Sequence, residues 1–344
     1  MSSQLTLITG VSGFVGFRVL AEALSRGRNV RAVIRKPEQA ERIKNTESVR
    51  PHVAKLEFSV VPDLLLPGAF DEVLHGVTEI IHVASPLPSS VPDSTDFQRD
   101  IVEPAIRGTM GVLESATKIS SIRRVVVTSS MAAFLDMTYF VTPDDTRVFN
   151  AQSRTAPPGS DLVASNAALA YCAAKATTLN ATDRFIEERQ PIFDIVNILP
   201  SLVVGKHELN QTREEVASGT NLLALGVLLS TNIEAPSPGA SVHIDDVART
   251  HLDALDPSIT GHRNYMCSSG GLEGTVWEDA KDIARKYFPK HVDDGTLSLS
   301  GTNTTKPIRL DSSATEEAFG WKFQSYEEQV KCLIEHYVSL PSSQ

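Results

Sequence analysis

Two side chains four residues apart, Tyr171 and Lys175, give this sequence its clearest capacity for chemistry. In a helix, residues i and i+4 lie on one face, so the phenol and the ammonium would be neighbours. A free tyrosine ionises near pH ~10, and a nearby cation favours the phenolate. The pair predicts proton transfer at an oxygen atom, although such pairs also arise by chance and need support from their surroundings.

One support is a run of hydroxyl groups. The strand-like residues 123–129 (RRVVVTS) end at Ser129, and Ser130 follows. In doubly wound sheets, ligands bind outside the carboxyl ends of the strands, where these hydroxyls would lie.

A second support is the glycine-rich segment 9–16 (TGVSGFVG), which follows a short apolar run and opens a helical pattern. Glycines at such a place permit a tight turn, close approach to a pyrophosphate and packing of helix on strand. The positive end of the helix then favours the phosphate charge. The alternative is a glycine-rich turn without a ligand. The spacing is GxxGxxG, which differs from the GxGxxG of many dehydrogenases.

The next strand-like run ends at Arg35 and Lys36. Many NAD-binding folds place an acidic residue here for the ribose 2′-hydroxyl, whereas the nearest acid in this sequence is Glu38. Two cations suit a 2′-phosphate, which arginine can bind as a fork. The pattern favours NADP(H), and a solvated charge pair at a helix start is the alternative.

Strand-like and helix-like segments alternate through the first 200 residues, which predicts βαβ units and a buried parallel sheet. The fold class is therefore α/β, a Rossmann-type doubly wound parallel sheet with a smaller C-terminal substrate lobe. Beyond residue 200 we expect a loop at 236–239 and helices near 213–230, 246–255, 275–287 and 325–338. Strands are expected near 5–9, 29–35, 57–61, 79–84, 123–129 and 193–199, and helices near 14–26, 38–46, 94–118 and 168–188.

Composition excludes several classes of protein. The 344 residues carry a net charge of −10, which argues against nucleic acid as a partner. We find no signal peptide and no transmembrane stretch, and three scattered cysteines fit a reduced protein. The sequence is expected to be cytoplasmic, free of membrane and metal sites, and a monomer or homodimer.

Together these motifs resemble the extended short-chain dehydrogenase/reductases, within them the dihydroflavonol reductase-like group and the fungal aldehyde and ketone (methylglyoxal-type) reductases. Besides TGxxGFxG and YxxxK, the similar pieces are 61–63 (VPD), 82–86 (HVASP), 126–130 (VVTSS), 170–172 (AYC) and 320–323 (GWKF). The similarity spans nearly the whole chain. It implies an NADP-binding Rossmann lobe at 1–200 with a returning segment near 241–266, and a substrate-binding lobe at 201–240 and 267–344.

The resemblance also implies roles for individual residues. Ser130 would bind the substrate oxygen, with Ser129 as the fallback. Tyr171 would protonate the carbonyl oxygen, and Lys175 would hold the nicotinamide ribose and lower the pKa of Tyr171. Ser85 would line the cofactor path. The cofactor-binding residues would be Gly10, Ser12, Gly13, Phe14, Val15, Gly16, Arg35, Lys36, Asp63, Leu64, Ala84, Tyr171, Lys175, Pro200 and Val203.

Three departures from the family pattern affect the substrate more than the cofactor. Arg107 stands before Gly108 where relatives often have asparagine. Leu199 stands before Pro200 where asparagine is common, and Lys206 follows Gly205 in place of proline. Other residues have plain structural interpretations. His82 is expected to be a buried, hydrogen-bonded histidine, Cys172 a packed side chain, and the 243–246 segment (HIDD) a turn and helix cap. Leu87, Met131, Phe134, Leu135 and Met137 suggest an apolar substrate pocket, with core packing as the alternative.

The sequence thus predicts an NADPH-dependent carbonyl reductase, reversibly an alcohol dehydrogenase, that acts on a small-to-medium aldehyde or ketone. A cofactor-retaining epimerase or dehydratase is one alternative, but arginines that could bind a sugar-nucleotide diphosphate are scattered. A non-catalytic NADP-binding sensor is the other, although it would not need both Tyr171 and Lys175. The arginines considered are Arg249, Arg263, Arg285 and Arg309.

Overall fold

The computed structural model describes residues 4–87, 96–143, 145–156 and 166–342. The chain divides into two compact units, each built from separate stretches of sequence. The first unit contains Met1–Val141, Gln152–Leu199 and Ala248–Tyr265. The second unit contains Thr142–Ala151, Pro200–Val247 and Met266–Gln344.

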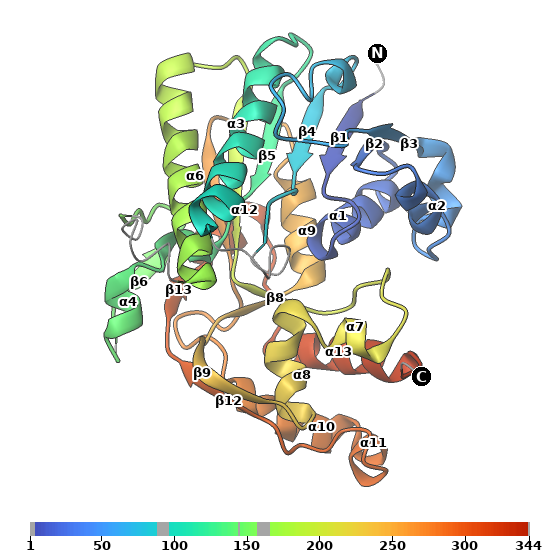
Figure 1. The fold of residues 1–344 in the computed structure, drawn as a ribbon, viewed down its shortest axis with the longest axis vertical. Coiled ribbons are helices and arrows are strands. Elements are labelled where there is room, and N and C mark those ends of the chain that lie inside the picture. The colour runs from blue at the N-terminus through green and yellow to red at the C-terminus, as the bar shows by residue number, and fades with distance from the viewer. Residues whose placement is uncertain (1–3, 88–95, 144, 157–165, 343–344) are drawn as a thin grey trace. The chain divides into compact units, whose positions relative to one another are not determined.

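A seven-stranded sheet forms the centre of the first unit, in the order β11-β7-β5-β4-β1-β2-β3 (Figure 1). The pairings from β7 to β3 are all parallel. From β1 the chain adds β2 and β3 on one side, and it then returns to add β4 on the other side of β1. Ligands of such sheets bind outside the carboxyl ends of the strands at this switch point between β1 and β4. The predicted Rossmann-type sheet is therefore confirmed. Its strands are β1 (Leu5–Thr9), β2 (Asn29–Ile34), β3 (Leu56–Val60), β4 (Glu79–His82), β5 (Arg124–Thr128), β7 (Asp194–Pro200) and β11 (Arg263–Cys267).

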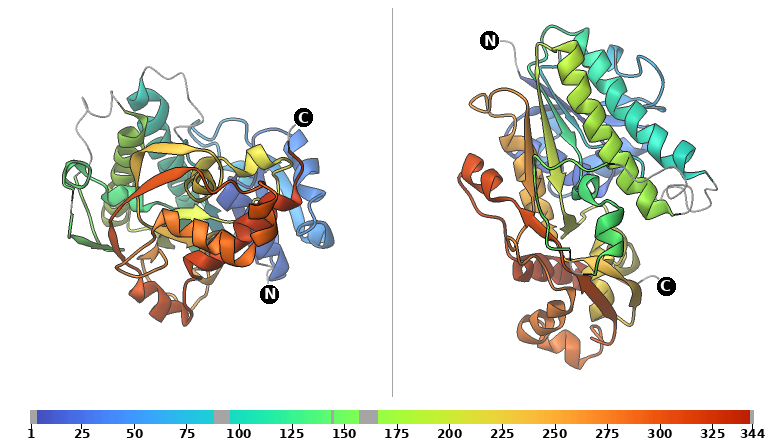
Figure 2. Two further views of the ribbon diagram at one scale, coloured as in Figure 1. Left: turned by 90° about the horizontal axis from the view of Figure 1, so that it is seen from below. Right: turned by 90° about the vertical axis from the view of Figure 1, so that its left-hand side faces the viewer.

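Helices cover both faces of this sheet, which explains why its inner strands are apolar along their whole length. In β4 and β7 nearly every residue is buried, as expected for parallel strands packed on two sides. Helices α3 and α6 lie side by side on one face, and α9 lies on the other (Figures 1 and 2). The helices of this unit are α1 (Phe14–Ser25), α2 (Glu38–Lys44), α3 (Glu103–Thr117), α4 (Met137–Val141), α6 (Ala167–Arg189) and, from Ala248 onward, α9 (Ile244–Asp253).

Helix α6 carries the tyrosine–lysine pair and has well-defined ends. The side chain of Asn166 caps its start by accepting hydrogen bonds from the backbone N–H groups of Ala168 and Leu169, at 2.8 and 3.2 Å. Gln190 ends it in the left-handed conformation. One face of α6 packs on α3 through a small apolar cluster that includes Ala170 and Ala174. The cap and this cluster therefore fix the first two turns of α6, which carry Tyr171 and lead to Lys175.

The second unit has its own core, in which Trp277 is fully buried among α8, α10 and α13. Its strands pair two by two: β8 with β10, β9 with β12 and β6 with β13. Among the described residues, no helix is both long and apolar enough to cross a membrane. The elements are β6 (Val148–Asn150), β8 (Leu202–Val204), β9 (Asn232–Pro238), β10 (Ser241–His243), β12 (Thr302–Lys306), β13 (Arg309–Asp311), α7 (Arg213–Val216), α8 (Leu222–Leu228), α10 (Ala280–Tyr287), α11 (Pro289–Asp293), α12 (Ser313–Phe319) and α13 (Tyr326–Ser339).

Two expectations for the second unit were wrong. The single helix predicted at 213–230 is interrupted, because Ala217 and Ser218 leave the helical conformation after α7, and Gly219 follows with a positive φ of 56°. The loop predicted at 236–239 is instead largely the end of β9. Pro236 and Pro238 are tolerated there because a two-stranded sheet has only edge strands, where a missing N–H costs little.

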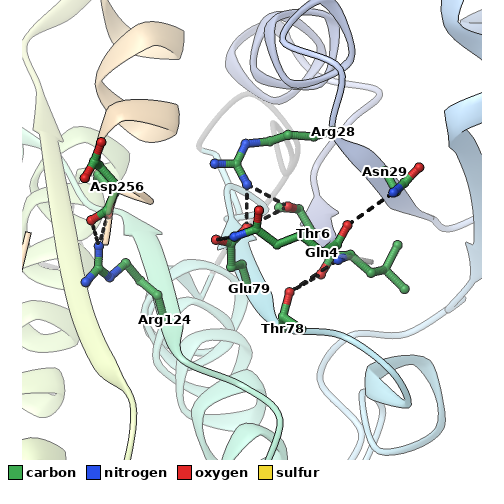
Figure 3. Close-up of polar contacts among 10 residues, drawn as sticks. Gln4, Thr6, Arg28, Asn29, Thr78, Glu79, Arg124 and Asp256 are labelled. Atoms are coloured by element: carbon green, nitrogen blue, oxygen red, sulfur yellow. Dashed lines mark hydrogen bonds and ion pairs between the residues drawn. The ribbon is translucent and has the colours of Figure 1, made fainter. Parts of the chain in front are cut away.

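A charged network closes the amino-terminal end of the first unit's sheet (Figure 3). Glu79, at the start of β4, accepts hydrogen bonds from Arg28 at 2.6 Å, Thr6 at 2.9 Å and Gln4 at 2.8 Å. The carboxylate is almost fully buried. Such a charge is tolerated in the interior only when its partners are complete, and here three donors satisfy it.

Candidate active site

The glycine-rich segment forms a tight turn between β1 and α1. Gly10 has φ +75°, and a Cβ atom built on it would lie 2.8 Å from the backbone N of Ala84. A Cβ on Gly16 would lie 2.1 Å from the carbonyl oxygen of Gly10. The two glycines are therefore needed for close approach of β4 and of α1, respectively. Neither position could hold a larger residue without moving the backbone.

The start of helix α1, at this turn, is suited to binding an anion. No side chain caps its start at Gly13, and no acidic residue lies in its first turn. The backbone N–H groups and positive end of a helix attract phosphate when no side chain competes. The turn itself includes Ser12, which is half-buried, and the first helical residues Phe14 and Val15. The segment thus fits the pyrophosphate of a dinucleotide.

Arg35 and Lys36 follow β2, the strand next to β1, and both side chains are exposed. Their backbone N–H groups donate to the side-chain oxygen of Gln39, at 3.0 and 3.1 Å. These bonds hold the turn into α2. They fix the backbone of the two residues, while their cationic side chains stay exposed. A 2′-phosphate beside the turn would meet charge-assisted donors.

After β3, Asp63 is exposed and Leu64 is half-buried. The Asp63 carboxylate accepts a hydrogen bond from the backbone N–H of Leu65 at 2.8 Å, so part of its capacity is used to shape its own turn. Its second oxygen has no described role. The structure therefore gives Asp63 a local structural function beside any contact with a ligand.

Tyr171, Lys175 and Ser130 lie together at the carboxyl end of β5. The ammonium nitrogen of Lys175 is 5.6 Å from the centre of the Tyr171 ring. It donates to the hydroxyl of Ser85 at 3.2 Å and to the backbone carbonyl of Thr128 at 3.3 Å. Ser130 hydrogen-bonds to the Tyr171 hydroxyl, and its own Oγ also accepts from the backbone N–H of Ala132 at 3.1 Å. The fold thus brings the three side chains together.

Burial sets the protonation of this group. It raises the pKa of Tyr171 to about 12, although the hydrogen bond with Ser130 acts in the opposite direction. It lowers the pKa of Lys175 to about 8. The resemblance implied that Lys175 lowers the pKa of Tyr171, whereas the largest cause of the shift in this structure is desolvation, which raises it. At neutral pH the phenol therefore holds its proton, while Lys175 is close to the point at which it loses its own.

A small cavity adjoins Lys175, with room for about one water molecule. The hydroxyl of Thr178 has no hydrogen-bond partner among the described residues and lines this cavity. Arg107 does not line it, because its side chain is exposed and donates to the backbone oxygen of Leu65 at 2.9 Å. The remaining lining residues are Ala84, Ser85, Ala105, Thr109, Val127, Thr128, Ser129, Lys175, Leu179, Thr182 and Asn197.

Pro200 and Val203 belong to the second unit. Pro200 is the last residue of β7, and Val203 is buried in β8 opposite Val242. Gly205 follows, and the side chain of Asn221 accepts from its N–H at 3.0 Å and donates to its carbonyl at 2.9 Å. These bonds hold the segment after β8.

Several other residues have structural roles. Cys172 is buried, and burial raises the pKa of its thiol to about 12, which suppresses the reactive thiolate. His243 accepts a hydrogen bond from the backbone N–H of Asp245 at 3.0 Å and so caps the start of α9. Within the described residues, no group of three or more potential ligands forms a metal site. The residues proposed for a substrate pocket differ in exposure: Met131, Phe134 and Leu135 are buried, whereas Leu87 is about half-exposed.

Ser85 was expected to line the cofactor path, but its hydrogen bond with Lys175, and the contributions of Thr128 and Thr178, were not predicted from the sequence. Ser85 and Thr128 are the acceptors of Lys175, and Thr178 shares its face of α6 at a distance of three residues. The i, i+3 spacing could have indicated Thr178. The carbonyl of Thr128 has no signal in sequence, because any residue supplies one.

Comparisons with known proteins identify the family and the fold. Residues 6–265 match the model of the NAD dependent epimerase/dehydratase family. The chain is 36% identical to ketoreductase CTB6 of Cercospora beticola, covering 99% of this chain and 97% of that one. It is 33% identical to the NAD-dependent epimerase/dehydratase ALT6 of Alternaria alternata over 95% and 96% of the two chains. Among solved structures, yeast methylglyoxal/isovaleraldehyde reductase Gre2 complexed with NADPH superposes with a TM-score of 0.81, at 26% identity over 98% of each chain.

Proposed function

The chain belongs to the NAD-dependent epimerase/dehydratase family, and from this premise we propose that it is an NADPH-dependent carbonyl reductase. It is an oxidoreductase, and its cofactor is NADP(H). The observation that carries the proposal is the buried Lys175 beside a protonated Tyr171 and Ser130. We assign it a small-to-medium aldehyde or ketone as substrate, with the reverse oxidation of the alcohol.

The residues present fit the cofactor. Gly10 and Gly16 permit the tight turn, because a Cβ at either position would overlap backbone atoms of the protein, and α1 begins without a competing cap. Arg35 and Lys36 would hold the 2′-phosphate, Asp63 and Leu64 the adenine side, and Ala84 the path toward the nicotinamide. When bound, the cofactor supplies a hydride to the carbonyl carbon. Ser12, Gly13, Phe14, Val15, Pro200 and Val203 complete the proposed set.

The side chains of the chain itself perform the proton transfer. The Ser130 hydroxyl orients the carbonyl oxygen of the substrate. Tyr171, which holds its proton because burial raises its pKa, donates that proton from its hydroxyl to the same oxygen. Lys175 stabilises the phenolate that forms, because its ammonium lies over the tyrosine ring. In the reverse reaction each group performs the opposite step.

We assign cofactor binding to the first unit and substrate selection to the second. The first contains the switch point, the glycine turn and the tyrosine–lysine helix. An epimerase of sugar nucleotides would need cations for a diphosphate, but the candidate arginines already have partners. These are Arg249 with Asp253, Arg263 with the carbonyl of His262, Arg285 with Asp282, and Arg309 with the carbonyl of Thr146.

The test is a spectrophotometric assay of NADPH oxidation with a panel of aldehydes, ketones and diketones. We expect turnover with several of them and little with nucleotide sugars. Activity confined to nucleotide sugars would replace this proposal with the epimerase. Cofactor binding without turnover of any compound would favour a sensor.

A further inference from the structure

The segment that follows β3 is attached to helix α3 at two points. At its start, a guanidinium nitrogen of Arg107 donates a hydrogen bond to the backbone oxygen of Leu65 at 2.9 Å. At its far end, Nζ of Lys118, the residue directly after α3, lies 2.7 Å from the carboxylate of Asp71. Two cations from one helix therefore hold the two ends of one segment, residues 63–71.

Between these two points, α3 presents glycines to the segment. Gly108 and Gly111 are three residues apart and so lie on one face of the helix. A Cβ on Gly108 would lie 3.7 Å from Cδ2 of Leu65, and one on Gly111 would lie 4.0 Å from the backbone oxygen of Leu64. Leu64 also packs against the hydrophobic core of this unit. Apolar contacts of this kind are not directional, so the orientation of the backbone depends on hydrogen bonds.

Both polar groups of the Leu65 backbone are hydrogen-bonded. Its N–H donates to the carboxylate of Asp63 at 2.8 Å, and its carbonyl accepts from Arg107. Asp63 is exposed, and this bond to Leu65 is the contact that directs its carboxylate. A change that releases the Leu65 carbonyl would therefore free the backbone of Leu65 and, with it, the side chain of Asp63.

The start of this segment lies beside the strand end that carries the other proposed cofactor residues. The backbone N–H of Val61 donates to the carbonyl of Ile34 at 2.8 Å, which continues the parallel pairing of β2 with β3. Arg35 follows Ile34 directly, and Asp63 follows Val61 by two residues. Both therefore lie at the carboxyl ends of adjacent strands, the edge at which doubly wound sheets bind their ligands.

We propose that Arg107 is a positioning residue for the adenine part of the dinucleotide, because it holds residues 63–65 in place through the Leu65 carbonyl. This role rests on the proposed cofactor. From the sequence we expected Arg107 to bear on the substrate, whereas its hydrogen bond is with the segment proposed for the adenine. NADPH and NADH share the adenine, so the role differs from that of Arg35, which is proposed to bind the 2′-phosphate alone.

The chain offers a matched control, because Lys118 holds the other end of the same segment. Arg107→Met and Lys118→Met each remove one cation and keep an unbranched stem. Both side chains are exposed, so both variants should fold.

The experiment measures dissociation constants for NADPH and NADH by fluorescence titration. We expect Arg107→Met to weaken both cofactors by a similar factor, about three- to tenfold, and Arg107→Lys to recover part of the loss. Lys118→Met should keep the wild-type dissociation constants. Equal constants for the two methionine variants would overturn the proposal. A loss confined to NADPH would also overturn it, because that result would place Arg107 on the 2′-phosphate.

Hydrogen exchange of the unliganded protein supplies a second measurement that needs no cofactor. Arg107→Met should speed exchange of the backbone amides at residues 63–66, and Lys118→Met should speed exchange at residues 69–71. Unchanged exchange at 63–66 in Arg107→Met would contradict the attachment on which the role depends. If the wild type binds neither cofactor, the proposed function fails and this role fails with it. Normal wild-type binding with unaffected Arg107 variants rejects the positioning role alone.

Discussion

The ladder between β1 and β4 begins and ends with a threonine bonded to the side chain opposite, yet the two ends differ in charge. At the amino-terminal end, Thr6 and Glu79 belong to a network with Arg28 (Figure 3). At the carboxyl end, Thr9 and His82 are neutral. A carboxylate at the second end would repel the phosphates that the glycine turn is shaped to bind. The Glu79 carboxylate, which joins the strands at the amino-terminal end of the sheet, therefore lies at the end away from the proposed cofactor.

The largest effect should come from the chemistry at the carboxyl end. Tyr171→Phe removes only the hydroxyl, so kcat should fall by about 10²–10⁴-fold while the melting temperature and NADPH affinity stay near wild type. Steady-state kinetics and thermal unfolding measure the two. Wild-type turnover by this variant would remove Tyr171 from the mechanism.

Cofactor choice should respond next. Arg35→Ala should raise KM for NADPH by about 10- to 150-fold and leave KM for NADH nearly unchanged, because the charge-assisted bonds go to the 2′-phosphate alone. Kinetics with both cofactors decide this. Equal kcat/KM for the two cofactors in the wild type would show that Arg35 and Lys36 are only a solvated helix start.

The amino-terminal end should affect stability without affecting the cofactor. Glu79→Gln removes the charge that satisfies Arg28 and should lower the free energy of unfolding by about 1–3 kcal/mol. Urea unfolding measures this, with an NADPH titration as the control. A weakened NADPH dissociation constant would show that the two ends of the ladder are coupled.

The smallest effect is a change in pH dependence. Burial lowers the pKa of Lys175 to about 8, so its cationic form is lost as pH rises through that value. Between pH 7 and 8.5, kcat/KM for carbonyl reduction should fall about fourfold. Lys175→Arg keeps a cation throughout this range, and its residual activity should lack the decline. The same decline in both proteins would assign it to another group.

Much of this fold could be predicted because its signals are local. The alternation of strands and helices predicted β1 to β5, β7 and the helices α1, α2, α3 and α6 in their order, but it did not predict α4 or β6, and it started α3 at residue 94 rather than 103. The family resemblance was confirmed. Beyond β7 the prediction was weaker, because the chain leaves the helical conformation at Ala217 and Ser218 within a pattern that predicts one helix. The short stretch 142–151 joins the second unit through pairing with β13, which no local pattern announces.

The site shows the same limit. The spacing of Tyr171 and Lys175 was enough to single them out as site residues. It could not predict that the pKa of Tyr171 is raised, because that shift depends on how far the whole fold removes the side chain from solvent. Likewise, the sequence indicated that His82 would be buried and hydrogen-bonded. It could not indicate that its partner would be Thr9, 73 residues earlier in the chain.

The first unit is built from three stretches that lie far apart in the chain, and this has a consequence for its synthesis on the ribosome. Arg124, buried at the start of β5, donates to the carbonyls of Ala254, Asp256 and Ile259, which follow it by 130 to 135 residues. At 5–20 residues per second, those acceptors emerge roughly 7–27 s after the arginine. During that interval the Arg124 guanidinium must be hydrated or form hydrogen bonds with other groups. The nascent sheet therefore cannot close at this edge until most of the chain has been made, and a ribosome-bound chain ending near residue 200 should be an open, protease-sensitive intermediate.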